Sequence, residues 1–272
     1  MTWQACAALV EAGDPDRFRA AMTGPVEARA RLFPLYAFNL EVAKAPWVTS
    51  EPALAEIRLQ WWRDALDEVY GGGPVRRHEV VTPLAEVIRG ARLPRPLFDA
   101  LIDARGFDCY TEPHAGRASF DAYIAASAGN LMRLSVAALS EGARSDRAVA
   151  DFGWGSGVAN LLRGLPALYA SGRQPIPVAG VLDRNALAEG RVPEGVRVAV
   201  REVATDALAR IAAARRAGRQ PRAAAPALRA GWRAEGILRA ARDHPGEILA
   251  PRIPSEARAR LALGLKTVLG RW

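Results

Sequence analysis

The sequence predicts a single all-α domain, and this prediction depends on its periodicity and its turn residues. No stretch of the 272 residues keeps the alternation of apolar and polar residues that marks a half-buried strand. Glycine and proline instead separate segments whose apolar residues recur at steps of three and four, the period of an amphipathic helix. No linker-like stretch divides these segments, so residues 1–272 are interpreted as one domain.

Proline and capping residues predict where the first helices begin. Asp14-Pro15 has the residue types of an N-cap and a first-turn position, so a helix should cover residues 17–22. Gly24-Pro25 opens the next helix, and Pro34 should kink or restart it. The side chains that this helix should direct to the core are those of Leu32, Phe33, Leu35, Tyr36 and Phe38.

A helix that begins at Pro52 has the clearest amphipathic pattern in the chain. Its expected buried face, spaced mostly by three and four residues, consists of Leu54, Ile57, Trp61, Ala65, Leu66 and Val69. The run Gly71-Gly72-Gly73-Pro74 should end this helix. Pro83 and Pro96 then predict the starts of the two helices that follow.

The second half of the chain is also predicted to be helical. The expected helices cover residues 120–139, 201–216 and 255–269, with room for a short one between 172 and 195. Small residues at 125–129 should let a neighbouring helix or a ligand approach closely. Ser145 is a candidate cap for the helix that leads to Asn160, and residues 217–227 are expected to form a mobile loop.

The composition narrows the functional classes. The chain has a net charge of +8 and a pI of about 10.3, and its positive charge is nearly all arginine. A GC-rich coding sequence is the simpler explanation of this bias, and attraction to phosphates is the functional one. Nucleic acid is not an expected partner, because the arginines are scattered and no recognised nucleic-acid-binding motif occurs.

Cysteine use and hydropathy bear on the compartment. Cys6 and Cys109 are far apart and outside any C-x-x-C, which argues against a disulfide framework or a zinc site. No apolar run is long enough to span a bilayer, and the first residues resemble neither a secretory signal nor a transit peptide. These features predict a soluble or peripheral protein in a reducing compartment.

Residues 160–177 lie in a stretch without acids. The chain has 29 acidic residues, yet none occurs between Asp151 and Asp183. The segment reads N-L-L-R-G-L-P-A-L-Y-A-S-G-R-Q-P-I-P and resembles the second signature of the squalene/phytoene synthase family, N-I-L-R-D-x-x-x-D-x-x-x-x-R-x-Y-L-P. The matching residues are Asn160, Leu162, Arg163, Arg173 and Pro177. The two aspartates of that signature fall on Gly164 and Leu168.

The first signature of the same family, Y-A-x-C-R-x-x-D-D-x-x-D, falls on residues 36–47. Tyr36 and Ala37 agree with it, and Asn39 replaces its cysteine. Its three acid positions carry Ala43, Lys44 and Trp47. The resemblance therefore keeps the frame of both signatures and loses their acids.

Weaker matches extend the resemblance over about residues 14–180. Residues 61–66 resemble the W-R-x-A-L segment of the family, and Tyr123 with Ala128-Gly129 resembles its Y-x-x-x-x-A-G helix. One branch, represented in mitochondria by a complex I assembly factor, also lacks the aspartates. The residues that resemble this branch are Tyr36, Asn39, Glu41 and Trp61-Trp62.

The resemblance implies an isoprenoid synthase-like helical bundle with a central cavity. In catalytic members of the family, magnesium ions bridge carboxylates on two facing helices to the departing diphosphate of an allylic substrate. Because the acids of both walls are lost here, the resemblance implies no catalytic residue, no metal and no cofactor. It implies a pseudoenzyme that acts as an assembly factor for respiratory complex I.

Two alternatives remain open beside this interpretation. One is a condensing prenyltransferase of the squalene/phytoene synthase type with a rebuilt site, for which magnesium would be expected. The other is a binding protein for an isoprenoid or a phospholipid that uses the inherited cavity. The expected partners are subunits or assembly intermediates of complex I, such a ligand, and a membrane surface. The expected location is the bacterial cytoplasm, with peripheral association at the inner membrane.

The candidate ligand-binding residues are those that the resemblance places around the cavity. They are Tyr36, Asn39, Trp61, Trp62, Tyr123, Asn160, Arg163 and Arg173. Arg163 and Arg173 are the leading candidates to hold a phosphate without magnesium, because guanidinium groups form paired hydrogen bonds with phosphate oxygens. The alternative is an ordinary surface ion pair with Asp151 or Asp183.

Two segments that contain tryptophan could have either a binding role or a purely structural one. Trp61 and Trp62 could line a hydrophobic cavity, although at least one of them is more simply a core residue. The segment Gly153-Trp154-Gly155-Ser156-Gly157 follows no strand and lacks the G-x-G-x-x-G spacing. It is therefore interpreted as a site of close helix packing rather than a phosphate-binding loop.

Overall fold

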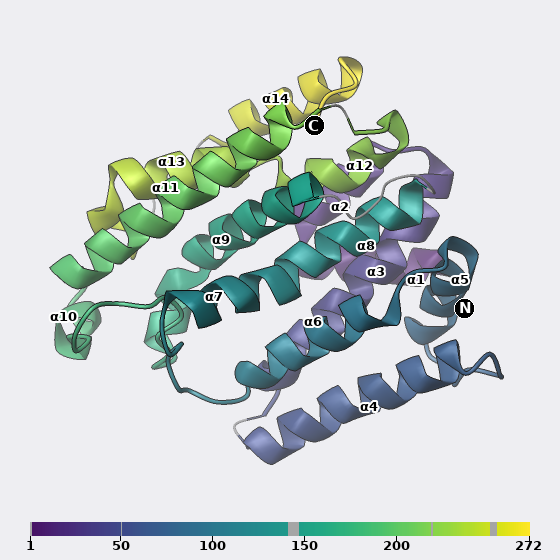
Figure 1. Cartoon of the computed structure of the whole chain (residues 1–272), viewed down its shortest axis with the longest axis horizontal. Coiled ribbons are helices and arrows are strands. Elements are labelled where there is room, and N and C mark those ends of the chain that lie inside the picture. Colours follow the sequence, from purple (N-terminus) through teal and green to yellow (C-terminus); the bar gives the residue numbers. More distant parts are fainter. Residues whose placement is uncertain (1, 50, 141–146, 219, 251–254) are drawn as a thin grey trace.

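The computed structural model describes residues 2–49, 51–140, 147–218, 220–250 and 255–272. These residues form helices, turns and loops and contain no strand (Figure 1). The all-α prediction is therefore confirmed. One cluster of buried side chains extends from Cys6 to Ile248 and joins most of the helices.

The helices follow one another with short connections. In the first part of the chain they are α1 (Trp3–Gly13), α2 (Pro15–Met22), α3 (Val26–Lys44), η1 (Ala45–Trp47), α4 (Pro52–Tyr70), α5 (Val81–Ala91) and α6 (Arg95–Phe107). In the middle they are α7 (Arg117–Ile124), the π-helix η2 (Ala125–Gly129), α8 (Asn130–Leu139), α9 (Arg147–Ala170) and α10 (Arg184–Ala188). The last are α11 (Glu194–Arg216), η3 (Arg222–Ala224), α12 (Ala225–Leu228), η4 (Arg229–Gly231), α13 (Ala234–Asp243), η5 (Pro245–Glu247) and α14 (Glu256–Val268).

Helix α9 lies at the centre of the bundle (Figure 1). It packs against α11 and α13 and also against α8 and η2. Helix α3 lies against α1, α5 and α8, whereas α4 lies at the edge of the bundle, where it contacts α6. The two helices that carry the family signatures, α3 and α9, are thus both inside the bundle.

The start of α2 is the local structure that the sequence predicts. The Asp14 carboxylate accepts a hydrogen bond from the backbone N–H of Arg17 at 3.0 Å, and Pro15 occupies the first turn. Helix α3 then runs through Pro34 as one element, so of the two predicted effects, a kink or a restart, the restart does not occur. Pro34 is itself buried in the core, and burial of the residues around it outweighs the lost backbone hydrogen bond.

The predicted core residues of α3 are confirmed, but the predicted buried face of α4 is partly wrong. Leu54 and Ile57 are 46% and 64% exposed. The side chains that α4 buries are Ala55, Leu59, Trp62, Ala65, Leu66 and Val69. The reason is that α4 is an edge helix, so its neighbours cover one side of it and leave apolar residues on the other side in water.

The helix α9 approaches η2 and α8 very closely because both sides of the contact lack bulk. A Cβ atom added at Gly157 would lie 2.5 Å from the Cβ of Ala128, and one at Gly153 would lie 2.7 Å from the Cβ of Met132. Distances this short are not compatible with a side chain. The prediction that residues 125–129 admit a neighbouring helix is therefore confirmed, as is helix packing at residues 153–157.

The remaining predictions of secondary structure are partly right and partly wrong. The short helix expected between residues 172 and 195 is α10, and the expected last helix is α14. The mobile loop expected at residues 217–227 is wrong in its second half, because Ala224 and Ala227 are buried in short helical turns that contact α8. The candidate cap Ser145 lies outside the described residues. Among the described residues, no helix is long and apolar enough to cross a bilayer.

Candidate functional site

A cavity of about 310 Å³ lies between α3, α6, α7 with η2, and α9. This volume is at the lower end of the roughly 300–1,000 Å³ usual for small-molecule sites. The cavity confirms the central cavity that the fold class implied. The residues of the described elements that face it include Asn39, Ala43, Trp47, Arg105, Tyr123, Ser127, Asn160, Arg163, Leu168 and Arg173.

The positions that correspond to the acids of the two signatures carry no metal ligand. Ala43, Trp47 and Leu168 face the cavity with carbon or indole groups. Lys44 forms an ion pair with Glu41 at 3.1 Å on the outside of α3, and Gly164 has no side chain. Magnesium requires oxygen ligands, usually carboxylates. The residues present on the two walls therefore do not fit the magnesium ions of the catalytic family members.

Two of the three described acids that line the cavity are engaged by arginines. Asp14 pairs with Arg17, and Asp108 pairs with Arg105 at 2.9 Å. Glu112, the third, is exposed to solvent. Within the described ranges no three His, Cys, Asp or Glu side chains converge as a metal site would require.

Tyr123 is held at the cavity wall by charged partners. Its hydroxyl accepts a hydrogen bond from Nη1 of Arg105 at 2.7 Å and donates one to Asp108 at 2.9 Å. Burial raises the pKa of Tyr123, so the phenol stays protonated and keeps its proton on the Asp108 side. Sequence reasoning found Tyr123 but missed Arg105 and Asp108, which lie outside both signatures.

His114 forms the other side of this wall. Its ring stacks on Phe107 with centroids 4.4 Å apart and lies 5.2 Å from the ring of Tyr123. Burial lowers the pKa of His114 below its ordinary value of 6.5, although the charge of Asp108 opposes the shift. The imidazole is therefore neutral in the folded protein at neutral pH.

This burial makes a pH dependence of stability testable. Below pH 6.5 the unfolded chain takes up a proton at His114 more readily than the folded protein does. The stabilisation from the neutral ring is therefore complete above this pH and is lost as the pH falls through the folded-state pKa. We expect His114→Phe, which keeps the stack on Phe107, to reduce the loss of melting temperature between neutral and mildly acidic pH. An unchanged loss in calorimetry would contradict this assignment.

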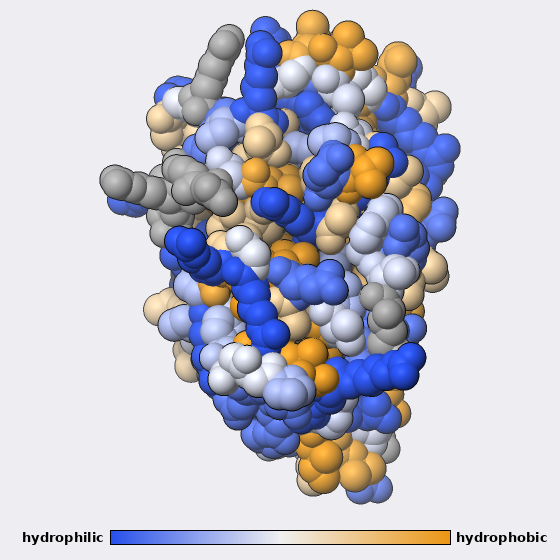
Figure 2. Space-filling view, turned by 90° about the vertical axis from the view of Figure 1, so that its right-hand side faces the viewer, coloured by the Kyte–Doolittle hydropathy of each residue, from blue (hydrophilic) through white to orange (hydrophobic). Residues whose placement is uncertain are grey.

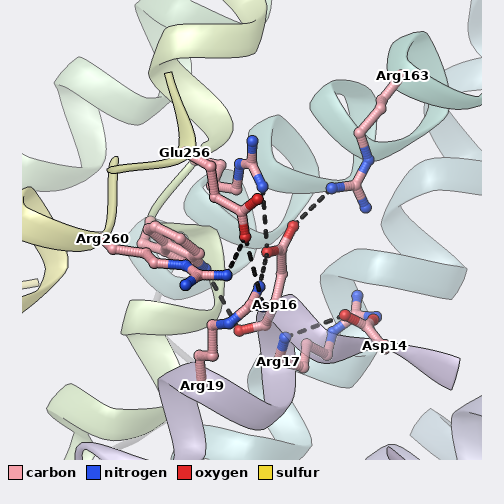
Figure 3. Close-up of polar contacts among 9 residues, drawn as sticks. Asp14, Asp16, Arg17, Arg19, Arg163, Glu256 and Arg260 are labelled. Atoms are coloured by element: carbon pink, nitrogen blue, oxygen red, sulfur yellow. Dashed lines mark hydrogen bonds and ion pairs between the residues drawn. The ribbon is translucent and has the colours of Figure 1, made fainter. Parts of the chain in front are cut away.

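Arg163 and Arg173 both face the cavity, as predicted, but with different partners. Nη1 of Arg163 forms an ion pair with Asp16 at 2.6 Å, not with Asp151 or Asp183 (Figure 3). Nη1 of Arg173 donates a hydrogen bond to the backbone oxygen of Tyr110 at 2.9 Å. Its guanidinium lies over the ring of Trp47 at 4.5 Å.

These contacts leave Arg173 without an acidic partner in the described part of the chain, whereas Arg163 is paired with Asp16. No carboxylate of the described residues lies within ion-pair distance of Arg173. A bound phosphate would therefore have to displace an acid from Arg163 but only a backbone oxygen from Arg173. The expectation that Arg163 pairs with Asp151 or Asp183 is wrong, because Asp151 faces Arg210 and Asp183 caps α10.

Asp16 holds Arg163 within a wider network (Figure 3). Its carboxylate lies 3.4 Å from Nη1 of Arg233 and 3.5 Å from Nη1 of Arg19. Its backbone oxygen accepts a hydrogen bond from Nε1 of Trp232 at 3.3 Å. The network therefore fixes α2 to α9 and to the segment before α13. Sequence reasoning missed Asp16, since its partners are far away along the chain.

The remaining predicted site residues divide between the cavity and the core. Asn39 and Asn160 both line the cavity. Tyr36 lies deeper, beside a smaller void of about 20 Å³ that Asn160 also reaches, and burial raises the pKa of Tyr36 to about 12. This tyrosine is therefore a neutral buried side chain behind the main cavity.

Trp61 and Trp62 do not reach the cavity, so their assignment as cavity residues is corrected. Trp62 is buried and packs edge-on against Phe38 with ring centroids 5.3 Å apart. Trp61 packs against Trp62 and lies under the guanidinium of Arg76 at 4.7 Å. The reason is that α4 is separated from the cavity by α3 and α6, so the two indoles fill space between these helices and α5.

Comparison with models of protein families identifies the family, over a region that includes both signatures. The squalene/phytoene synthase model matches residues 10–262. The chain belongs to the squalene/phytoene synthase family. This assignment confirms the resemblance drawn from the two signatures, and it extends over the C-terminal region, where the residues themselves gave little resemblance.

Curated relatives of this family member share a name. The bovine protein (Bos taurus) named NADH dehydrogenase (ubiquinone) complex I, assembly factor 6 is 24% identical over 162 residues, which are 59% of this chain and 48% of that protein. Its Drosophila melanogaster homolog is 27% identical over 189 residues, which cover 63% of this chain and 52% of that protein. The chain therefore spans about half the length of the curated relatives it matches.

Solved structures of the squalene/phytoene synthase family have the same fold. Squalene synthase HpnC from Alicyclobacillus acidocaldarius superposes with a TM-score of 0.76 at 21% identity, over 89% of this chain and 93% of that one. A ligand-bound dehydrosqualene synthase superposes with a TM-score of 0.73 at 14% identity, over 98% and 96% of the two chains. These likenesses confirm the isoprenoid synthase-like bundle.

Proposed function

We propose that the chain is a non-catalytic squalene/phytoene synthase-like protein that acts as an assembly factor for respiratory complex I. The observation that carries the proposal is the chemistry of the cavity walls. Ala43, Trp47 and Leu168 stand where carboxylates would hold magnesium, and two of the three acids that the described residues contribute to the cavity are paired with arginines. Relatives named as complex I assembly factors support the second half of the proposal.

An exposed apolar surface gives this proposal a place for a protein partner. Trp47 and Val48 in and after η1, together with Leu54 and Ile57 of α4, are each about half or more exposed. A groove lined by residues of η1, the start of α4 and the segment around Tyr110 adjoins the cavity. Apolar side chains grouped in this way are typical of protein-binding surfaces. We assign this surface to a partly assembled subunit of complex I.

Gene deletion tests the assembly role. We expect the deletion to lower the amount of assembled complex I and to leave squalene- and phytoene-type products unchanged. The wild-type gene should restore assembly, and a gene carrying Ile57→Glu should restore less, because the charge interrupts the apolar surface. Normal complex I together with a lost isoprenoid product would overturn the proposal and favour a prenyltransferase with a rebuilt site.

The purified chain gives a direct test of the missing chemistry. We expect no condensation of farnesyl or geranylgeranyl diphosphate in the presence of magnesium, because the cavity offers no set of carboxylates that could hold the magnesium ions needed to neutralise a departing diphosphate. Product extraction and chromatography would measure this. Product above that of a boiled control would show that the chain is an enzyme.

Binding of an isoprenoid diphosphate or an anionic phospholipid is a second candidate function, and Arg173 favours it. We expect Arg173→Ala to weaken the binding of inorganic pyrophosphate about tenfold, since a charge-assisted hydrogen bond contributes roughly 1.5–3 kcal/mol. Arg163→Ala should weaken it less, because Asp16 already holds that guanidinium. Titration calorimetry with and without EDTA measures both effects. A strong loss on adding EDTA would mean that a metal takes part.

The net charge of the chain supports a location at a membrane surface. A net charge of +8 favours an anionic surface, and each basic residue near such a surface contributes about 1 kcal/mol. We therefore place the protein in the bacterial cytoplasm, bound peripherally to the inner membrane, where complex I is assembled.

A further inference from the structure

The outer surface of α14 is apolar, although this helix lies on the outside of the bundle (Figure 1). Leu261, Leu265 and Val268 are 75%, 60% and 86% exposed. They recur at steps of four and three residues, so they share one face of the helix. Among the residues of α14, Leu263 is the side chain that is buried against the body. It lies on the opposite face, so the exposed stripe points away from the protein.

Basic residues border this apolar stripe. Arg258 and Arg260 lie in the first half of α14, and Arg271 follows it. Its single acid, Glu256, is already paired with Arg260 at 2.5 Å. In the space-filling view, hydrophobic groups at the upper edge of the molecule stand beside hydrophilic ones at the level of α14 (Figure 2).

The body beneath α14 adds positive charge rather than compensating for it. Burial, together with the nearby charges of Arg215 and Arg229, lowers the pKa of Lys266 to about 8. Glu235, an acid in this region, is paired with Arg215. The potential at this end of the helix is therefore positive.

Helix α14 is held in place at both ends, so it presents its stripe as a preformed surface. Glu256 at its start lies 3.4 Å from Nη2 of Arg19 on α2. After its end, the backbone oxygen of Arg271 accepts a hydrogen bond from Nε of Arg229 at 2.9 Å. The helix does not have to fold when it binds, and its binding surface is already ordered.

We infer that the outward face of α14 is the surface through which the chain binds an anionic phospholipid bilayer. A helix with an aliphatic face bordered by arginine lies in the plane of a membrane interface, with its apolar side chains among the acyl chains and its cations at the phosphates. The inference rests on the peripheral membrane location in the proposed function and assigns that role to one surface.

The other exposed apolar surface fits a bilayer less well. The residues around η1 and the start of α4 are of mixed charge, because Glu51, Glu56 and Glu112 lie among Arg58 and Arg173, so this surface lacks the net positive charge of α14. The stripe of α14 also lacks the tyrosine and tryptophan side chains that dominate the centres of protein–protein interfaces, because Trp272 instead packs on Phe152. Charge and composition therefore both favour lipid at α14 and protein at α4.

Vesicle sedimentation with the full chain tests the inference. Wild-type protein should bind vesicles of phosphatidylcholine containing phosphatidylglycerol and bind phosphatidylcholine vesicles weakly. Val268→Glu should lower the partition coefficient about tenfold or more, because it removes an inserted side chain and adds a charge that the phosphates repel. Arg258→Glu should lower it on anionic vesicles alone.

Val181→Glu is the matched control, because Val181 is 99% exposed and lies far along the chain from α14. It should bind like wild type, and circular dichroism should show that all variants are folded. Equal binding by Val268→Glu and wild type would overturn the inference, as would a loss caused by Ile57→Glu instead.

Two further outcomes would also overturn the inference. One is a wild-type chain that binds neither kind of vesicle. The other is a dimer in sedimentation velocity that Val268→Glu converts to a monomer, because the stripe would then contact a second copy. The assembly role is measured separately, by complex I in deletion strains, so either idea can fail without the other.

Discussion

Replacing Gly157 with leucine should lower the free energy of unfolding by at least about 3 kcal/mol, because overpacking a dense contact costs roughly 1–3 kcal/mol even for small insertions. A Cβ atom at this position would lie 2.5 Å from the Cβ of Ala128 and 2.9 Å from Cγ2 of Ile124. The Cβ of Ala128 cannot move without shifting η2 away from α9. Urea unfolding followed by circular dichroism measures the change.

Gly164→Ala is the control on the same helix. The nearest atom to an added Cβ at Gly164 is Cδ1 of Leu168, at 3.8 Å, which is ordinary contact. Alanine should therefore raise the free energy of unfolding by about 0.5–1 kcal/mol, the usual cost of glycine inside a helix. A Gly157→Leu protein as stable as wild type would show that α9 and η2 are not packed as described.

The helices could be predicted because their signals are local. Asp14 caps α2 from the adjacent residue, and Gly71 ends α4 where the glycine run begins. Close packing at residues 153–157 was also readable, since a helix with several glycines and an unusually small partner segment has few other uses. Residues that are neighbours in the sequence decide these features, so the sequence alone is enough to predict them.

The burial of α4 could not be predicted in the same way. A period of three and four residues shows that a helix has apolar positions but not which of them its neighbours cover. Leu54 and Ile57 are exposed because α4 is an edge helix, and this depends on how the whole bundle is arranged. Trp61 and Trp62 lie outside the cavity for the same reason.

The residues of the cavity could be predicted from the sequence only in part. The gapless frame of the second signature placed Arg163 and Arg173 at the cavity, because residues on one helix and its following turn keep their relative positions. The same frame contained nothing about Asp16, which lies 147 residues before Arg163. Partners that the fold brings together over such separations leave no local pattern in the sequence.

Replacing Asp16 with asparagine should both destabilise the protein and free Arg163. The carboxylate is 13% exposed and lies near three arginines, of which Arg233 is nearly as buried. Removing one member of a buried charge pair costs about 3–5 kcal/mol, and the lower value is expected here because Arg163 is 36% exposed. Urea unfolding should therefore show a loss of about 3 kcal/mol.

The same substitution should strengthen the binding of inorganic pyrophosphate. In the wild-type protein a phosphate must displace Asp16 to reach Nη1 of Arg163, whereas in Asp16→Asn that competing charge is gone. Glu189→Gln is the control, because its ion pair with Arg191 is exposed and neither residue lines the cavity. Titration calorimetry should thus give tighter binding with a less stable fold for Asp16→Asn and no change for Glu189→Gln. Weaker binding by Asp16→Asn would mean that Asp16 orients Arg163 for the ligand rather than competing for it.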